Sequence, residues 1–146
     1  MNNYVKYPVA YLSGGCFWHI QEYFSNLDGI LDTKVGYMGL KIKPTYEKVC
    51  QSNNYTETIM IRYNPKKISY ENILIHFFNI HNANKKVNKE QYKSYVYYSN
   101  NYQYYVYKTL IKNIKYRNIR TKIIPKIKKT FHIAENYHQH YIKKNK

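Results

Sequence analysis

Cysteine and long apolar runs are scarce in this chain, and each shortage excludes a class of protein. Two cysteines, Cys16 and Cys50, cannot form the disulfide framework of a small secreted protein. No apolar run approaches the roughly 18–20 residues that span a bilayer, and the first residues lack the apolar segment of a signal peptide. We therefore expect a cytoplasmic protein. Its 146 residues suffice for one domain with a buried core, and we expect loose ends at residues 1–7 and 143–146.

Acidic residues are also few: eight of them oppose 24 lysines and arginines, which gives a formal net charge of +16. Such a charge favours acidic partners, and the 20 tyrosines offer surfaces on which unpaired bases can stack. The basic residues are scattered along the chain, however, apart from a tract near the C-terminus. Lys, Asn, Ile and Tyr also share A/T-rich codons. A protein that binds RNA or an anionic surface therefore remains the alternative from another functional class.

Only five glycines occur, and two of them, Gly14 and Gly15, stand directly before Cys16. Residues 9–13 are short and mostly apolar, which is typical of a strand. The apolar residues that follow recur at helical spacing: Phe17, Ile20, Phe24 and Leu27. The pattern predicts a strand, a glycine turn and a helix whose first turn holds Cys16, where free N–H groups and the helix dipole lower the thiol pKa. The alternative is a buried structural cysteine.

The remaining elements follow from hydrophobic periodicity and turn signals. Strands are predicted over residues 30–37, 56–63, 92–98 and 121–124. Helices are predicted over residues 70–81, 102–116 and 134–142. Residues 38–54 are predicted to form a long loop, which is more often functional than not. The order βαββαβ, with a further helix, strand and helix, predicts an α+β fold: a two-layer α/β sandwich with a ferredoxin-like core, a mixed sheet and an additional C-terminal helix.

Glu57 lies at the beginning of the strand predicted over residues 56–63. Alternation places it on the same face as Ile59, Ile61 and Tyr63. A carboxyl group beside apolar neighbours loses hydration, so its pKa rises and it can stay protonated near neutrality. The alternative is a frayed strand end with Glu57 turned to solvent, and periodicity does not separate the two. In a two-layer fold, the glycine turn and this strand end meet at one edge of the sheet, which would bring Cys16 near Glu57.

Six short segments, spread over about residues 8–145, carry a resemblance to a known family. They are Gly-Cys-Phe-Trp at 15–18 with Glu22 beyond it, Gly-Tyr-x-Gly at 36–39, Pro-Thr-Tyr-x-x-Val-Cys at 44–50, Glu57 ahead of Tyr-Asn-Pro at 63–65, Gln-Tyr-x-Ser at 91–94, and Ala-Glu-x-Tyr-His-Gln-x-Tyr at 134–141. Together and in this order, they resemble the peptide-methionine (S)-S-oxide reductases, the A-type methionine sulfoxide reductases.

The resemblance implies a protein-repair enzyme that reduces methionine S-sulfoxide, free or in proteins, under oxidative stress. It assigns catalysis to Cys16, Glu57, Tyr46 and Tyr92, and substrate binding to Phe17 and Trp18. The cysteine thiolate attacks the sulfoxide sulfur, the glutamic acid protonates the oxygen, both tyrosines hydrogen-bond that oxygen, and the aromatic pair encloses the methyl group. Taken alone, these four aromatic residues would be ordinary core or surface residues.

The resemblance also implies how the enzyme is regenerated and what it does not need. Thioredoxin or a similar dithiol reduces the sulfenic acid left on the cysteine. The resemblance implies an enzyme that needs no cofactor and no metal and binds no specific nucleic acid and no membrane. We expect a monomer. His132, His138 and His140 lack cysteine or carboxylate partners at ligand spacing, so we expect surface histidines and not a metal site.

Several positions depart from the family pattern. His19 and Leu40 stand where the family has glycine, so we expect a reshaped pocket. The stretch before Tyr92 is short and lacks an aspartate, with Val87 or Asn88 near its place, so KM is the parameter expected to suffer first. A diverged, weakly active member with a binding role is thus a second alternative.

No cysteine follows Cys50, so the C-terminal resolving cysteines of many relatives are missing. The resemblance then implies that Cys16 works as a single catalytic cysteine whose sulfenic acid is attacked directly by an external reductant. A disulfide between Cys16 and Cys50 is the alternative scheme.

Overall fold

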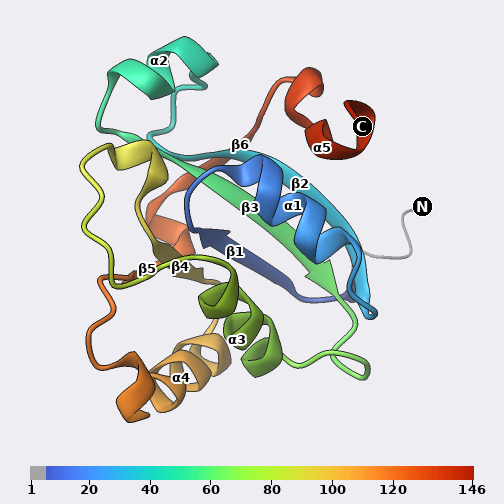
Figure 1. The fold of residues 1–146 in the computed structure, drawn as a ribbon, viewed down its shortest axis with the longest axis vertical. Helices are drawn as coiled ribbons and strands as arrows, with labels where there is room; N and C mark the ends of the chain where they lie inside the picture. The colour runs from blue at the N-terminus through green and yellow to red at the C-terminus, as the bar shows by residue number, and fades with distance from the viewer. Residues whose placement is uncertain (1–5) are drawn as a thin grey trace.

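A six-stranded sheet with the order β5-β4-β1-β3-β2-β6 forms the centre of the computed structural model, which describes residues 6–146 (Figure 1). Its strands are β1 (Val9–Ser13), β2 (Ile30–Gly39), β3 (Tyr55–Tyr63), β4 (Tyr95–Tyr98), β5 (Lys122–Pro125) and β6 (Thr130–Ile133). Neighbouring strands are antiparallel except β4 and β5, which are parallel. The predicted mixed sheet is confirmed. The inner order β4-β1-β3-β2 is compatible with a ferredoxin-like core.

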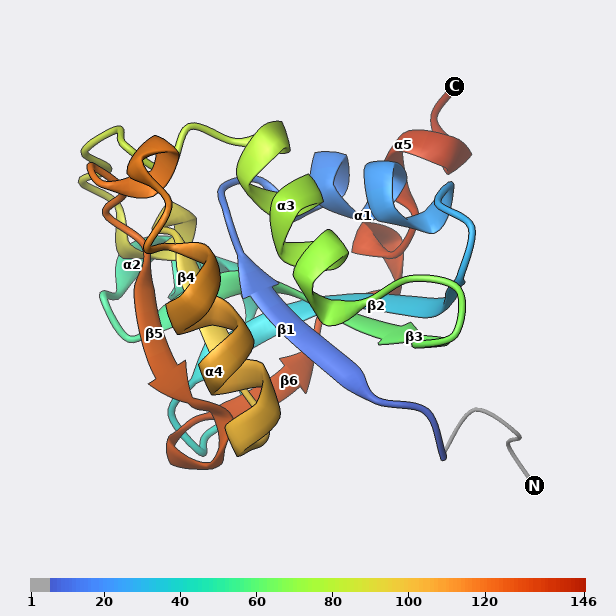
Figure 2. The same ribbon diagram turned by 90° about the horizontal axis from the view of Figure 1, so that it is seen from below.

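Helices pack on the sheet and give the fold its second layer. They are α1 (Phe17–Ser25), α2 (Tyr46–Gln51), α3 (Tyr70–Ile80), α4 (Asn101–Leu110) and α5 (Tyr141–Lys144). Figure 2 shows α1 and α3 side by side above the central strands. Side-chain caps begin two of the longer helices: Ser69 Oγ accepts from the amide of Asn72, and Asn100 Oδ1 accepts from that of Gln103.

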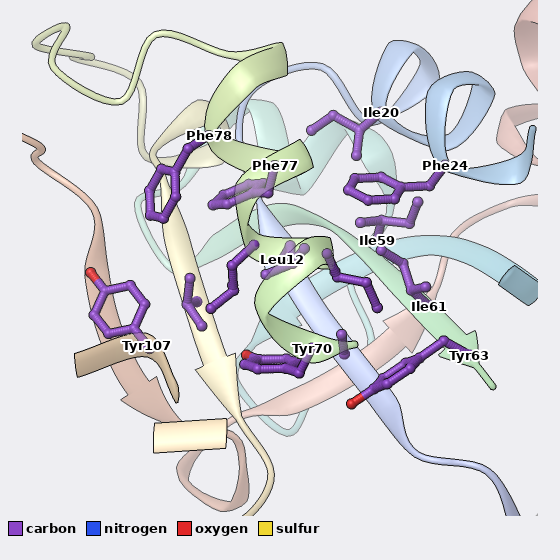
Figure 3. Close-up of a cluster of buried hydrophobic side chains, with 14 of the residues drawn as sticks. Leu12, Ile20, Phe24, Ile59, Ile61, Tyr63, Tyr70, Phe77, Phe78 and Tyr107 are labelled. Atoms are coloured by element: carbon purple, nitrogen blue, oxygen red, sulfur yellow. The ribbon is translucent and has the colours of Figure 1, made fainter. Parts of the chain in front are cut away.

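The main hydrophobic core lies between this helical layer and the sheet (Figure 3). Leu12 of β1 and Ile59 and Ile61 of β3 point from the sheet toward Phe24 of α1 and Phe77 of α3, and all five side chains have no exposed surface. Each such side chain stabilises the fold by about 1.5–3 kcal/mol relative to an exposed one. The alternation predicted for β3 therefore sets which of its faces the helices cover.

The segment predicted as a long loop, residues 38–54, is in part regular. The strand β2 continues to Gly39, and α2 occupies Tyr46–Gln51. Thr45 caps α2, because its Oγ1 accepts a hydrogen bond from the amide of Lys48 at 3.2 Å. The loop prediction is wrong here because α2 depends on the Thr45 cap and lacks helical hydrophobic periodicity.

The helix predicted over residues 134–142 is also wrong. The strand β6 precedes this segment, a 3₁₀ turn covers Asn136–His138, and α5 begins only at Tyr141. The side chain of Gln139 explains the extended path, since its Oε1 accepts from the Val35 amide at 2.9 Å and its Nε2 donates to the Val35 carbonyl at 2.8 Å. The side-chain amide of Gln139 thus continues the hydrogen bonding of β2, which a helix over this segment could not do.

Two further boundaries differ from the prediction. Tyr92 belongs to a 3₁₀ turn, Glu90–Tyr92, and β4 begins only at Tyr95. The helix predicted over residues 102–116 ends at Leu110 and is followed by a 3₁₀ turn at Ile114–Tyr116, which Asn113 caps. Of the expected loose ends, residues 1–5 lie outside the described residues, while Lys143 and Lys144 belong to α5.

Candidate active site

Cys16 lies at the start of α1, directly after the glycine turn that follows β1. Gly15 has φ of 102°, a left-handed conformation that favours glycine. A Cβ on Gly14 would come within 2.8 Å of the Phe77 ring. The chain can therefore pass closely over α3 and place Cys16 as the N-cap residue of α1, half-buried and not in a disulfide. The predicted strand, turn and helix are confirmed.

The predicted direction of the Cys16 pKa shift is wrong. Burial raises the pKa of the thiol above its ordinary value, and the nearby Glu57 charge raises it further. Hydrogen bonding by the backbone amides of Trp18 and His19 lowers it, but this effect does not outweigh burial. The thiol therefore holds its proton until a base removes it.

Glu57 is a buried carboxyl group next to the chain that carries Cys16. Glu57 is only 1% exposed, so the alternative in which it faces solvent at a frayed strand end is wrong. Oε1 accepts from the amide of Phe17 at 3.3 Å, and Oε2 accepts from Nε2 of Gln91 at 2.9 Å. Burial raises the pKa of Glu57 to about 6, although both hydrogen bonds lower it. The group can therefore exchange a proton near neutral pH.

Tyr46 and Tyr92 converge on the same carboxyl group from α2 and from the 3₁₀ turn before β4. Burial raises the pKa of each hydroxyl, and the Glu57 charge adds to the rise in both. The hydroxyl of Tyr46 also interacts with the Cys50 thiol and with Tyr92. Both tyrosines consequently stay protonated and keep an O–H to donate.

Phe17 and Trp18 have different environments. Phe17 is 1% exposed and packs against Tyr37 and His138. Trp18 is half-buried, its Nε1 donates to Nδ1 of His138 at 2.9 Å, and its ring stacks on Tyr141 at 3.8 Å. The exposed part of this aromatic pair therefore belongs to Trp18, while Phe17 packs in a core cluster.

Three site residues had no predicted role. Gln91 is buried and joins two groups, because its Nε2 donates to Glu57 and also lies 3.5 Å from the sulfur of Cys50. Its place next to Tyr92 was a usable signal. Glu135 accepts from the hydroxyl of Tyr37 at 2.7 Å and from the amide of Tyr46 at 3.1 Å.

The third such residue is His138, which orients Trp18 and is only 1% exposed, so the expectation of a surface histidine is wrong at this position. Burial lowers its pKa, so the ring is neutral and Nδ1 is free to accept from the indole. For Glu135, burial raises the pKa, but the hydrogen bonds outweigh it and hold the pKa below its usual value. An ionised carboxylate thus fixes the start of α2 and with it Tyr46.

The two positions where glycine was expected do not strain the backbone. His19 lies inside α1 and Leu40 directly follows β2. Neither has a positive φ, since within residues 6–146 only His140 does so among non-glycine residues. The reshaped pocket expected from these two side chains stays a prediction. No helix among the described residues is long and apolar enough to cross a membrane, and none of their His, Cys, Asp and Glu side chains gather in threes at a candidate metal site.

Comparison with known sequences gives consistent matches over most of the chain. A family model described as peptide methionine sulfoxide reductase matches residues 8–146. A peptide methionine sulfoxide reductase MsrA from Campylobacter jejuni is 39% identical over 142 residues, which cover 92% of this chain and 85% of that protein. The MsrA of Picrophilus torridus is 35% identical over 147 residues, covering 94% and 82% of the two chains.

Solved structures give the same result for the fold. The reduced form of Mxr1 from Saccharomyces cerevisiae superposes with a TM-score of 0.79 at 27% identity, covering 94% of this chain and 85% of that chain. Methionine sulfoxide reductase A of Corynebacterium diphtheriae superposes with a TM-score of 0.77 at 23% identity, covering 94% and 74%. A third structure holds Mxr1 in complex with Trx2, with a TM-score of 0.60 and 23% identity over 97% of this chain and 92% of that chain.

Proposed function

Since the chain belongs to the peptide methionine sulfoxide reductase family and carries its activity, the thioredoxin-linked reduction of methionine sulfoxide, we propose that Cys16 is the nucleophile and Glu57 the proton donor toward the S epimer. The observation that carries the assignment is the buried Glu57 carboxyl group, hydrogen-bonded to the amide of the residue that follows Cys16. A reducing compartment, the cytoplasm, suits a chain whose two cysteines are both free.

The two groups share one proton near pH 7. The thiol pKa is raised and the carboxyl pKa is about 6, so the resting pair holds the proton mainly on Cys16. Transfer of that proton to Glu57 creates the thiolate and the acid together. The thiolate then attacks the sulfoxide sulfur, and Glu57 returns the proton to the oxygen. The S–S bond made by this attack and the S–O bond of the substrate then break as the hydroxyl group passes to the Cys16 sulfur. The cysteine is thereby oxidised by two electrons to a sulfenic acid, and methionine is released with its sulfur reduced by two electrons.

The aromatic residues position the sulfoxide. Tyr46 and Tyr92 keep their hydroxyl protons because their pKa values are raised, so both can donate to the oxygen as negative charge grows on it. Trp18, held by His138 and Tyr141, offers the apolar surface for the methyl group. Phe17 packs in the cluster that Trp18 lies against, and we assign it with Trp18 to the pocket for the methyl group.

Regeneration runs through an external dithiol. Yeast Mxr1, a relative, has been crystallised with Trx2, and we assign the same kind of partner to this chain. A single-cysteine scheme lets thioredoxin attack the sulfenic acid directly. The nearness of Cys50 to Gln91 and Tyr46 keeps a Cys16–Cys50 disulfide as the competing scheme. A dimedone-type probe separates them: equal trapping in wild type and Cys50→Ser supports the first, and trapping only in Cys50→Ser supports the second.

The decisive assay measures dithiothreitol-driven reduction of N-acetyl-methionine sulfoxide as separate S and R epimers. Turnover of the S epimer that is abolished by Cys16→Ser and retained by the matched Cys50→Ser supports the proposal. Turnover of both epimers at equal rates, or activity that survives Cys16→Ser, contradicts it. A KM far above that of relatives with an intact kcat would instead mark the diverged, weakly active member.

A further inference from the structure

An open cavity of about 940 Å³ adjoins the candidate active site. Gly14 and Gly15, the two residues before Cys16, form part of its wall, and so does Tyr92. The rest of the wall comes from the segment 81–89, from the end of the 3₁₀ turn before β4, and from the chain around β5. A ligand in this cavity would therefore contact the glycine turn that precedes Cys16, and Tyr92 of the candidate site.

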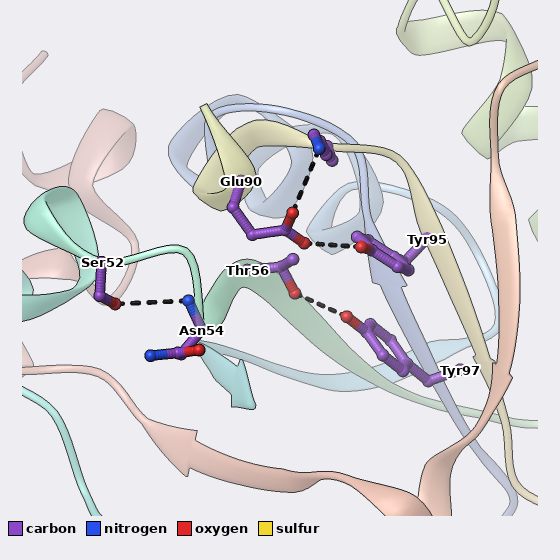
Figure 4. Close-up of polar contacts among 7 residues, drawn as sticks. Ser52, Asn54, Thr56, Glu90, Tyr95 and Tyr97 are labelled. Carbon is purple, nitrogen blue, oxygen red and sulfur yellow. Dashed lines mark hydrogen bonds and ion pairs between the residues drawn. The ribbon is translucent and has the colours of Figure 1, made fainter. Parts of the chain in front are cut away.

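The cavity is lined by cations and by no carboxylate. Its basic residues are Lys85, Lys86, Lys89, Lys93, Arg120 and Lys122. Among the described residues, only Lys93 of these six is in an ion pair, with Glu90 at 3.3 Å. Figure 4 shows that Glu90 is also held by the Tyr95 hydroxyl, which donates to it at 2.6 Å. Arg120 Nε donates to the carbonyl oxygen of Asn84 at 3.0 Å, and among the described residues no carboxylate pairs with the other five cations except at Lys93.

The segment 81–89 also lacks the aspartate that the family pattern places before Tyr92. Val87 and Asn88, which stand near the place of the family's aspartate, both line the cavity. No negative charge therefore opposes Lys85, Lys86 and Lys89, whose residues are all exposed. Loss of the aspartate and gain of the lysines act in the same direction, toward a ligand that carries negative charge.

We propose that this cavity binds acidic residues that flank the oxidised methionine of a protein substrate, so that the enzyme prefers methionine S-sulfoxide in an acidic sequence. The inference rests on the proposed function. A peptide extended across Tyr92 advances about 3.3 Å per residue, so the side chains that flank the methionine would enter the cavity that Tyr92 shares with the lysines. The position of Gly15 and Tyr92 in the wall favours a peptide over an anion unrelated to the reaction, because both residues adjoin the candidate active site.

The test compares pentapeptides that carry a central methionine S-sulfoxide between glutamates, glutamines or lysines. Dithiothreitol serves as reductant, so that no protein reductant competes for the cavity, and N-acetyl-methionine S-sulfoxide reports the chemistry without flanking residues. At low ionic strength, kcat/KM for the glutamate peptide should exceed that for the glutamine peptide by about fivefold or more, and the lysine peptide should be poorest. The preference should shrink in about 0.5 M salt, where exposed charges are screened.

Two triple variants of equal charge locate the effect. Lys85→Gln/Lys86→Gln/Lys89→Gln should bring the glutamate-to-glutamine ratio of kcat/KM close to one. Lys66→Gln/Lys108→Gln/Lys112→Gln removes the same charge from exposed residues outside the cavity wall and should keep the wild-type ratio. An equal ratio for the wild-type peptides, or an equal fall in both triples, would overturn the inference while leaving the proposed function intact. Wild-type failure on N-acetyl-methionine S-sulfoxide would overturn the proposed function itself.

Discussion

At the scale of single residues, burial acts on Cys16 and Glu57 in the same direction. Loss of hydration penalises both anions, so each pKa rises, and the Glu57 charge adds to the rise at Cys16. A helix start alone would have produced a permanent thiolate. The structure instead gives a pair in which deprotonation of one group is coupled to protonation of the other, and this coupling sets the pH dependence of activity.

The first prediction is a pH profile with an acid limb near pH 6. Below that pH both groups hold protons and no base remains for the thiol, so kcat/KM falls; above it, activity stays level until the raised thiol pKa is reached. Glu57→Gln should lower kcat/KM by about 100-fold or more and remove this limb. Steady-state rates from pH 5 to 10 with the S epimer check it. If the acid limb near pH 6 persists in Glu57→Gln, the limb belongs to a titrating group other than Glu57.

The second prediction concerns stability and uses the same variant. A raised carboxyl pKa means that the folded protein holds this proton more tightly than the unfolded chain does. The associated stability is complete below the ordinary pKa of 4.5 and is lost as pH rises through about 6. Glu57→Gln should therefore raise the free energy of unfolding by about 2 kcal/mol at pH 8 and change it little at pH 4. Urea unfolding at both pH values tests this; equal effects at both would contradict the burial argument.

Gln91 carries the third prediction, as a positioning residue. Its Nε2 donates to Glu57 Oε2 and lowers the carboxyl pKa. Gln91→Leu should move the acid limb of kcat/KM upward by about one pH unit, because a hydrogen bond to a charged group contributes about 1.5–3 kcal/mol. Gln103→Leu is the matched control: Gln103 is equally buried, but its side chain binds Ser99 and Val9. A limb that moves in both variants, or in neither, would reject the role.

At the scale of elements, the C-terminal segment completes the site although it lies far from Cys16 in sequence. The strand β6 pairs with β2, and Gln139 continues that pairing with Val35. This path places His138 at the Nε1 edge of the Trp18 indole and stacks Tyr141 on the indole face. An ordinary helix over this segment would have carried both residues away from α1, so the pocket that we propose for the methyl group depends on the irregular backbone.

The fourth prediction tests that dependence with His138→Phe. The substitution keeps a ring in the core cluster but removes the Nδ1 acceptor of the Trp18 indole, so the indole loses a fixed orientation. KM for the S epimer should rise about fivefold, the size of one hydrogen bond, with kcat little changed. The matched His76→Phe removes a hydrogen bond to Tyr23 outside the site and should leave KM as it is. A fall in kcat with constant KM would show that His138 acts on the chemistry instead.

Sequence patterns predicted the elements that bury a regular face. Alternation located β3 and the face of Glu57, and the glycine turn located Cys16. The patterns missed α2, which depends on the Thr45 cap, and β6, which alternates polar and apolar residues over only four positions, Thr130–Ile133. They also reversed the Cys16 pKa shift, because desolvation depends on what packs around the thiol, and no local pattern contains that information. Tertiary contacts decided each of these points.

At the scale of the whole molecule, few of the cations behind the net charge of +16 are paired with a carboxylate. Within residues 6–146 only three ion pairs form, and in each the lysine side chain is at least 37% exposed. Exposed pairs of this kind contribute little to stability. The dominant long-range electrostatic effect on the folded state is therefore repulsion among its lysines and arginines, which compaction strengthens.

The last prediction is that salt stabilises this protein. Screening weakens repulsion among many cations while it costs only a few weak ion pairs. Raising NaCl from 20 to 300 mM should increase the free energy of unfolding in urea by on the order of 1 kcal/mol. Lys66→Gln/Lys108→Gln/Lys112→Gln lowers the net charge from +16 to +13 and should reduce this salt dependence. Stability that falls as salt is added would contradict this prediction, because it would mean that specific ion pairs outweigh repulsion. The positive charges around the cavity would then have to be balanced by attractive interactions within the folded protein.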